Sequence, residues 1–539
     1  MRYHGFVAKY TPETVAGKYD RMSESLATLL ADLDAVAQLD AKAQKACAER
    51  TRWLRTASNR EIREFLQQLL QRSPPDGPPQ DAWFAAACLQ LFLRQHQTPQ
   101  HPQVPAADDE TCELVTKLVR HLGSACRARE RLLAWLVASQ IPAGLTSLAQ
   151  LLAEDPPADA TVVATLLSPF FQRRNYDPQL LFPRLLDGLV HPSAAAAVLD
   201  LANFVTREAL TPRHPAADRV GTLASLLSGV VGRLSCLESA PVDAGVSPAV
   251  MVGQVQEGIT LAVSLCDALA QIGDNSIVGK LYQTLELSHR RVRAEAAYAL
   301  ARLGEQAGAD TLVALAAEPV VRLRVLAYAE ELGILDKIEA PYRTEQARAE
   351  AELALWLAQP SQLGYPPTRC ELIDTRLIYW PGYDGPMQCS LFRFTYQFGD
   401  RGFSNIGLTG PLVHAFTADL LDLPPDDIYA VFAGWQAEHA EIYEIELDGL
   451  DEAQRNEVYR LERRLRDEGY EAVEPLKLGH FFGAKVLVAR VLRQGQPGAA
   501  VVGPEQVDWL PRSASRRPPG PDEAYWIYKG RRLLRAFNP

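Results

Sequence analysis

The sequence lacks several features that mark membrane and secreted proteins. No uninterrupted apolar run approaches the roughly 18 residues of a membrane span, and the first ten residues lack the apolar core of a signal peptide. The eight cysteines include no Cys-x-x-Cys pair, and most lie inside apolar helical patterns. They are therefore expected to be buried, reduced thiols rather than zinc ligands or disulfides. These absences predict a cytoplasmic protein without a membrane segment.

The chain also lacks an excess of basic charge and every catalytic signature of high specificity. A net charge of −11 over 539 residues argues against a protein dominated by nucleic-acid binding. No phosphate loop, dinucleotide fingerprint, His-Glu-x-x-His motif, nucleophile elbow or calcium loop occurs. The sequence therefore implies no cofactor and no metal site, and it does not favour an enzyme.

What is present is mostly helical. The length exceeds that of one ordinary core, so two or more domains are expected. Up to about residue 359, apolar residues recur at three- and four-residue spacing, as in Leu26, Leu29, Leu30 and Leu33. Beyond that point a two-residue alternation begins, which is typical of half-buried strands.

One stretch of the helical part repeats itself. The segment 289–304 aligns with the segment 318–333, so that Val292 matches Val321 at an offset of 29 residues. Both segments end in a Leu-Gly pair. A period of about 30 residues with two helices per unit predicts an α-solenoid, because one helix pair cannot bury its apolar face without a stacked neighbour.

The repeated segment resembles a known family. The Val-Arg pairs at 292–293 and 321–322, the small residues at Ala296 and Ala327, and the Leu-Gly ends make residues 258–334 similar to short bacterial HEAT repeats. Such repeats occur in phycobilin lyases and in bacterial scaffolding proteins. The resemblance implies an all-α HEAT-like solenoid that binds a protein partner in a bacterial cytoplasm.

The hydrophobic pattern divides the chain into two predicted domains. Residues 1–359 are expected to form the solenoid, residues 360–369 a linker rich in Pro and Gly, and residues 370–539 an α+β module with a mainly antiparallel sheet. In this module we expect strands at 372–380, 392–398, 484–492, 499–502, 525–528 and 532–537, and helices at 411–421, 425–446 and 450–467.

The best candidate for chemistry is the glycine-rich segment 399–414. Its four glycines and Pro411, at an expected first helical position, would place free backbone N–H groups and a helix N-terminus beside a bound anion. The alternative is an ordinary turn and helix cap. The candidate ligand-binding residues are Arg401, Ser404, Asn405, Thr409, Gly410 and His414.

Charge is unevenly divided within the module. Residues 402–454 contain eleven acidic and no basic side chains, whereas residues 475–539 contain eleven basic and four acidic ones. The basic tail could bind an acidic partner or nucleic acid, or it could face the acidic stretch within one domain, which we favour. The residues concerned are Arg512, Arg516, Arg517, Lys529, Arg531, Arg532 and Arg535.

These patterns favour a HEAT-repeat interaction or scaffold protein that binds a protein partner, with a second recognition surface in the C-terminal module. The first alternative is an enzyme with an active or anion-binding site near residues 399–414. The second is nucleic-acid binding through the basic C-terminal segment. Fold resemblance by itself does not decide among them.

Overall fold

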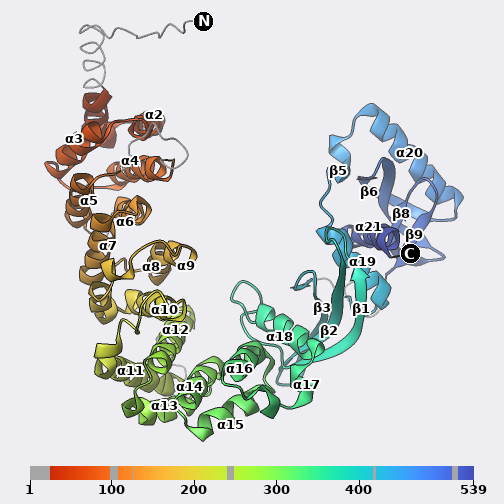
Figure 1. The fold of residues 1–539 in the computed structure, drawn as a ribbon. Helices are drawn as coiled ribbons and strands as arrows, with labels where there is room; N and C mark the ends of the chain where they lie inside the picture. Colours follow the sequence, from red (N-terminus) through yellow and green to blue (C-terminus); the bar gives the residue numbers. More distant parts are fainter. Residues whose placement is uncertain are drawn as a thin grey trace, which may run out of the picture. The chain divides into compact units, whose positions relative to one another are not determined.

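A computed structural model describes residues 25–97, 107–123, 126–239, 248–416, 420–512 and 520–538. The chain forms two compact units, Met1–Gly308 and Ala309–Pro539. The first unit is helical, and the second combines helices with two antiparallel sheets (Figure 1). This confirms the predicted fold class, an all-α HEAT-like solenoid followed by an α+β module.

Helices follow one another through the first unit. After a helix at 25–35 come α2 (Ala41–Arg50), α3 (Asn59–Leu70), α4 (Pro78–Gln97), α5 (Asp109–Leu122), α6 (Arg127–Ser139), α7 (Pro142–Glu154), α8 (Ala160–Leu167), α9 (Pro169–Gln172), α10 (Pro192–Arg207), α11 (Val220–Ser239), α12 (Pro248–Ile272), α13 (Val278–Leu285) and α14 (Arg290–Arg302). Short 3-10 helices lie between some of them: η1 (Val36–Gln38), η2 (Thr51–Arg55), η3 (Pro178–Leu180), η4 (Arg184–Val190), η5 (Ala217–Arg219) and η6 (Asn275–Ile277).

The later helices of this unit pack as stacked pairs. Helix α11 packs on α12 and α13 packs on α14, while α12 also packs on both α10 and α14. Val292, Ala296 and Leu300 are buried on α14, as the repeat pattern predicts. Gly304 follows the helix with φ +89°, a conformation that glycine adopts without a steric penalty.

One helix of the first unit is unusually apolar. By length and composition alone, the helix over Ala217–Ser239 is long enough to cross a membrane. Its buried side chains form a single stripe, Leu223, Leu227, Val230 and Leu234, and α11 packs on α12. A single buried stripe is the pattern of an amphipathic helix packed against a neighbour.

The second unit begins with a run of helices, of which the last, α18, packs against the first sheet. They are α15 (Gln306–Leu315), which begins just before the unit boundary, α16 (Pro319–Glu331), η7 (Leu335–Lys337), α17 (Ala340–Arg343) and α18 (Glu345–Leu357). The first sheet has the order β1-β2-β3-β4, from β1 (Arg369–Tyr379), β2 (Pro386–Phe398), β3 (Arg401–Thr409) and β4 (His414–Ala415).

The predicted linker lies inside this unit, between α18 and β1. Leu353 and Leu357 of α18 form one apolar cluster with Phe392, Phe394 and Tyr396 of β2. Helix α18 therefore shares a core with the strands that follow it. The division of the chain into compact units falls earlier, at Gly308.

The second sheet has helices on both faces. Its order is β5-β6-β7-β8-β9, from β5 (Ile442–Glu446), β6 (Glu471–Phe481), β7 (Ala484–Arg493), β8 (Gln496–Val502) and β9 (Val507–Pro511). Helix α20 (Glu452–Asp467), preceded by η8 (Leu447–Gly449), covers one face through Leu461 and Leu465. Helices α19 (Pro425–Gln436) and α21 (Pro521–Phe537) contribute to the core on the other face.

Several predicted elements of this unit are wrong. Residues 411–416 form no helix and include β4, the helix that starts at Pro425 ends at Gln436 rather than Glu446, and residues 525–537 belong to helix α21 rather than to two strands. Tyr525 and Tyr528 are buried because they lie three residues apart on one face of a helix. The predicted strands at 372–380, 392–398, 484–492 and 499–502 and the helix at 450–467 all correspond to observed elements.

Candidate binding surfaces

The glycine-rich segment is a strand rather than a turn that leads into a helix. Residues Arg401–Thr409 form β3, which pairs with β2 in the register Phe398 to Arg401 and Ser390 to Thr409. No helix begins at Pro411, so the predicted helix N-terminus for an anion does not exist. A strand rises about 3.3 Å per residue, so Arg401 and Thr409 lie roughly 26 Å apart.

The polar residues at the inner end of β3 are buried and satisfied within the fold. Asn405 donates from Nδ2 to the carbonyl oxygen of Phe416 at 2.9 Å, and its Oδ1 accepts from the backbone N–H of Ile406 at 2.8 Å. Thr409 donates to the carbonyl oxygen of Ser390 at 3.5 Å. Both side chains hold neighbouring segments together.

The remaining predicted ligand residues are spread along the sheet. Arg401 is exposed at the β2–β3 turn, and Ser404 shares a hydrogen bond of 2.8 Å with Thr395 on the neighbouring strand. Gly410 has φ +126°, and a Cβ at this position would lie 2.2 Å from the carbonyl oxygen of Gln388. This glycine permits a close backbone approach rather than contact with a ligand.

His414 lies in an aromatic cluster. Its ring stacks on Trp435 with centroids 4.3 Å apart and an interplanar angle of 10°, and it meets Phe416 edge-on at 4.7 Å. Partial burial lowers the pKa of His414 from its ordinary value. The neutral imidazole is therefore favoured, and the ring serves as one member of an apolar contact between β4 and α19.

Three of the five described residues of the basic tail make contacts inside the second unit. Arg531 donates from Nε and Nη2 to the carboxylate of Asp427 at 2.7 and 2.8 Å, and from Nη1 to Asp508 at 3.1 Å. These hydrogen bonds raise the pKa of Arg531. Lys529 is buried, with Nζ 4.7 Å from the ring centroid of Tyr525, and desolvation lowers the pKa of Lys529.

The other tail residues do not form one basic face. The Arg532 guanidinium lies 4.7 Å over the Tyr528 ring, whereas Arg535 and Arg512 are exposed at two different pockets. Arg516 and Arg517 lie outside the described residues. Asp427 belongs to the acidic stretch 402–454. Its pairing with Arg531 is therefore a contact between the acidic stretch and the basic tail within one domain, as the favoured interpretation expects.

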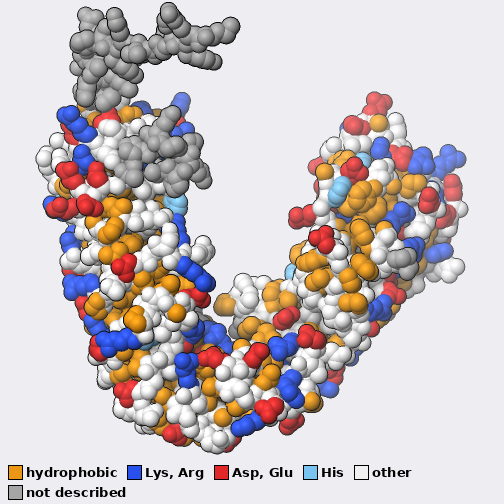
Figure 2. All heavy atoms as spheres, viewed as in Figure 1, with side chains coloured by type: hydrophobic (Ala, Val, Ile, Leu, Met, Phe, Trp, Pro, Cys, Tyr) orange, Lys and Arg blue, Asp and Glu red, His pale blue; other side chains and the backbone are white. Residues whose placement is uncertain are grey.

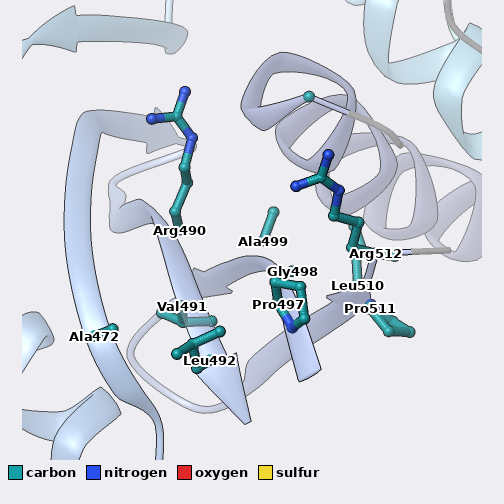
Figure 3. Close-up of a pocket in the computed structure, with 11 residues that line it drawn as sticks. Ala472, Arg490, Val491, Leu492, Pro497, Gly498, Ala499, Leu510, Pro511 and Arg512 are labelled. Carbon is teal, nitrogen blue, oxygen red and sulfur yellow. The ribbon is translucent and has the colours of Figure 1, made fainter. Parts of the chain in front are cut away.

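One pocket of about 500 Å³ lies on the second sheet. Arg490 and Arg512 rise on either side of a small apolar floor that includes Pro497 and Ala499 (Figure 3). Arg490 also pairs with Glu474 at 3.2 Å. The described lining residues include no Ser, Thr, Cys, His, Lys, Asp or Glu side chain.

A second pocket of about 460 Å³ lies between β1, α19 and α21. It contains Arg376, Arg531 and Arg535, together with the carboxylate of Asp426. Arg376 pairs with both Asp426 and Asp374, which raises its pKa. The positive charge in this pocket is therefore largely compensated by neighbouring carboxylates.

Across the described ranges, no three His, Cys, Asp or Glu side chains are placed to hold a metal ion. The eight cysteines are free thiols, and six of them are buried. Desolvation raises the pKa of Cys112 to about 12, which keeps this thiol protonated at neutral pH.

Comparison with known proteins identifies one part of the chain. No curated protein matches the sequence. The family model of HEAT repeats matches residues 260–333, which cover α13 and α14, most of α12, and the helices α15 and α16. This agrees with the predicted repeat at 258–334, and the stretch 260–333 is therefore identified as HEAT repeats.

Proposed function

We propose that this chain is a HEAT-repeat interaction protein, in which the helical unit binds a protein partner and the second unit provides another recognition surface. The HEAT-repeat match at residues 260–333 carries this proposal, since stacked helix pairs expose long surfaces while contacting only near neighbours inside. We also propose that these repeats are of the bacterial type found in phycobilin lyases and scaffolding proteins.

The contacts of the second unit favour this function over the two alternatives. An enzyme near residues 399–414 would need Arg401, Asn405 and His414 to converge, whereas β3 separates the first two and Asn405 is buried. A nucleic-acid surface would need the tail arginines exposed together, whereas Arg531 is paired with Asp427 and Asp508. No specific observation on the described residues supports either the enzyme or the nucleic-acid-binding alternative.

We further propose that the protein works in the cytoplasm of a bacterium. The free, mostly buried thiols support a reducing compartment, because disulfide-bonded cysteines are commoner in oxidising ones. Nothing in this proposal requires a metal or an organic cofactor.

The start of α12 offers a place to test partner binding. Val250 and Val252 are 52% and 68% exposed on its first turns, so both side chains project into solvent on a helix that otherwise packs on α10, α11 and α14. Gln254 and Gln256 are exposed on the same helix. Adding two aspartates at either pair changes charge equally, but only the first pair removes exposed apolar surface.

The experiment is quantitative affinity capture with the full chain in the organism that encodes it. We expect one or more proteins to be enriched over an unrelated bait, and Val250→Asp with Val252→Asp to lower their recovery. The matched control, Gln254→Asp with Gln256→Asp, should keep it. A wild-type chain that enriches nothing over the unrelated bait would contradict the proposed function.

A further inference from the structure

The second sheet ends in an exposed edge strand. Strand β5 pairs with β6 on one side, and no other strand of the described chain pairs with its outer side (Figure 1). Only its first residue is engaged by a neighbouring segment, since the backbone N–H of Ile442 donates to the carbonyl oxygen of His439 at 2.9 Å. Tyr443, Glu444 and Glu446 are exposed along it. An edge of this kind presents unpaired backbone N–H and C=O groups to any extended chain that reaches it.

Beside this edge, a bulky residue occupies an unfavourable backbone conformation. Phe482 and Gly483 form the two-residue turn between β6 and β7, with φ +46° and +80°. A turn with both φ values positive favours Asn-Gly, whereas a phenylalanine pays a steric penalty there. Phe482 is nevertheless 48% exposed, so no complete burial of its ring offsets the strain.

Phe482 belongs to a group of aromatic rings along the edge. Its centroid lies 4.8 Å from His439, and Tyr443, also 48% exposed, stacks on His480 at 4.3 Å. His480 itself is only 9% exposed, and its Nε2 has no hydrogen-bond partner in the described residues. Figure 2 shows apolar side chains gathered over β5 and β6 on this face of the unit.

Acidic side chains border these rings. Glu438 and Glu441 are exposed, and their carboxylates form no ion pair with any described residue. Glu444 and Glu446 face the ammonium of Lys477 at 3.1 and 3.8 Å, a cation that Asp522 also shares, and the ammonium of Lys529 lies near Glu444. The four glutamates therefore leave a net negative rim around an apolar centre.

We propose that this surface, formed by Glu438, His439, Glu441, Tyr443, Glu444, Glu446 and Phe482, binds an extended segment of a partner protein by adding a strand to β5. The segment has basic side chains alternating with apolar ones. Basic side chains lie on the face of Glu444 and Glu446, and apolar ones lie on the face of Tyr443. This inference specifies the second recognition surface proposed above and is independent of the helical unit.

The test uses the full chain and a labelled peptide that alternates lysine with valine, followed by fluorescence anisotropy. We expect saturable binding that weakens as salt rises, because the rim is exposed and screened. A glutamate–valine peptide of equal length should not bind. A lysine–valine peptide with a central proline should bind at least about tenfold more weakly, since proline cannot donate to the edge.

Three variants separate this surface from general charge. Glu438→Lys with Glu441→Lys should weaken binding at least about tenfold, because it reverses the rim without breaking an internal ion pair. Asp384→Lys with Asp400→Lys, at two exposed turns of the first sheet, makes the same change of charge and should bind like wild type. Phe482→Asn should raise Tm by a few degrees, since it creates the favoured Asn-Gly turn, and should weaken binding at the same time.

Equal binding of the lysine and glutamate peptides, or wild-type binding by Phe482→Asn, would overturn the inference. So would full binding of the peptide with central proline, because the contact would then be side-chain charge alone. The variant with Val250→Asp and Val252→Asp should still bind the peptide, so failure of partner capture by the helical unit and failure at β5 are distinguishable.

Discussion

The contacts inside the two units differ in how far apart their residues lie in the sequence. In the helical unit, a buried serine, Ser264, donates to Asp200 only 64 residues earlier, on a helix that packs directly on its own. In the second unit, Arg531 pairs with Asp427 across 104 residues, and Asn538 bonds the backbone of Tyr379 across 159 residues. In the helical unit each helix is therefore stabilised by helices near it in the sequence. In the second unit the last helix, α21, contacts elements that are far earlier in the sequence.

The largest expected effect comes from a charge in the repeat core. Leu300 of α14 is fully buried, so Leu300→Asp removes apolar contacts and buries an unpaired carboxylate. We expect a loss of about 4 kcal/mol, with increased hydrogen exchange concentrated in α12–α14. Gln256→Asp, on the exposed face of α12, should change stability by less than about 0.5 kcal/mol. Equal effects would mean that the repeat register is wrong.

The second unit should be most sensitive where α19 and α21 cross. A Cβ on Gly530 would lie 1.8 Å from the carbonyl oxygen of Ala430, and one on Gly434 would lie 1.9 Å from that of Trp526. Gly530→Ala should therefore force the helices apart and cost about 3 kcal/mol in the free energy of unfolding. Chemical denaturation monitored by hydrogen exchange in both helices and in β1 measures this. Unchanged exchange there would contradict the close crossing.

The same difference in sequence separation explains which elements could be predicted from the sequence. The helix of Val292 and Ala296 is predicted correctly because the period of a helix is visible in its own residues, and the alternation in β2 is equally local. The glycine-rich segment 399–414, which includes Gly407, is not predicted correctly in this way, because the neighbours of its residues are distant in sequence. In the structure Gly407 lies in β3 beneath Leu353, where a Cβ would meet that side chain at 2.6 Å.

The candidate site failed for the same reason. Arg401, Asn405 and His414 are close in sequence, but a strand separates residues that a turn would have gathered. The edge surface on β5 was not predicted at all. Its only sequence signal is a bulky Phe482 before Gly483, where a hairpin favours Asn, together with the excess of acidic residues in 402–454.

A pH change should weaken the helical unit through His214. The backbone N–H of Ala216 donates to Nδ1 at 3.1 Å, so Nε2 carries the proton that Asn203 Oδ1 accepts at 2.9 Å. Burial lowers the pKa of His214 to about 4, so the unfolded chain binds a proton more readily. Stability is complete above the ordinary pKa of about 6.5 and is lost as pH falls toward 4.

Between about pH 7 and about pH 5 this contribution amounts to about 2 kcal/mol. Denaturation curves of wild type and His214→Gln across that range measure it, because only the wild type carries the titrating ring. The difference in the free energy of unfolding between them should shrink as the pH is lowered. A difference that does not vary with pH would show that His214 has the same pKa in the folded and the unfolded state.

The smallest effect should have the opposite sign from Gly530→Ala, although the substitution is the same. Gly253 lies inside α12, and a Cβ there would meet no atom within 4 Å. Alanine restricts the unfolded chain and favours the helix, so Gly253→Ala should stabilise the protein by about 0.5–1 kcal/mol. Chemical denaturation of both variants under one condition gives the comparison. The contrast arises because α12 leaves this side open to solvent while α21 lies directly on the backbone of α19. Destabilisation by Gly253→Ala would show that a further element covers this side of α12. The helical unit would then also depend on contacts between residues that are distant in sequence.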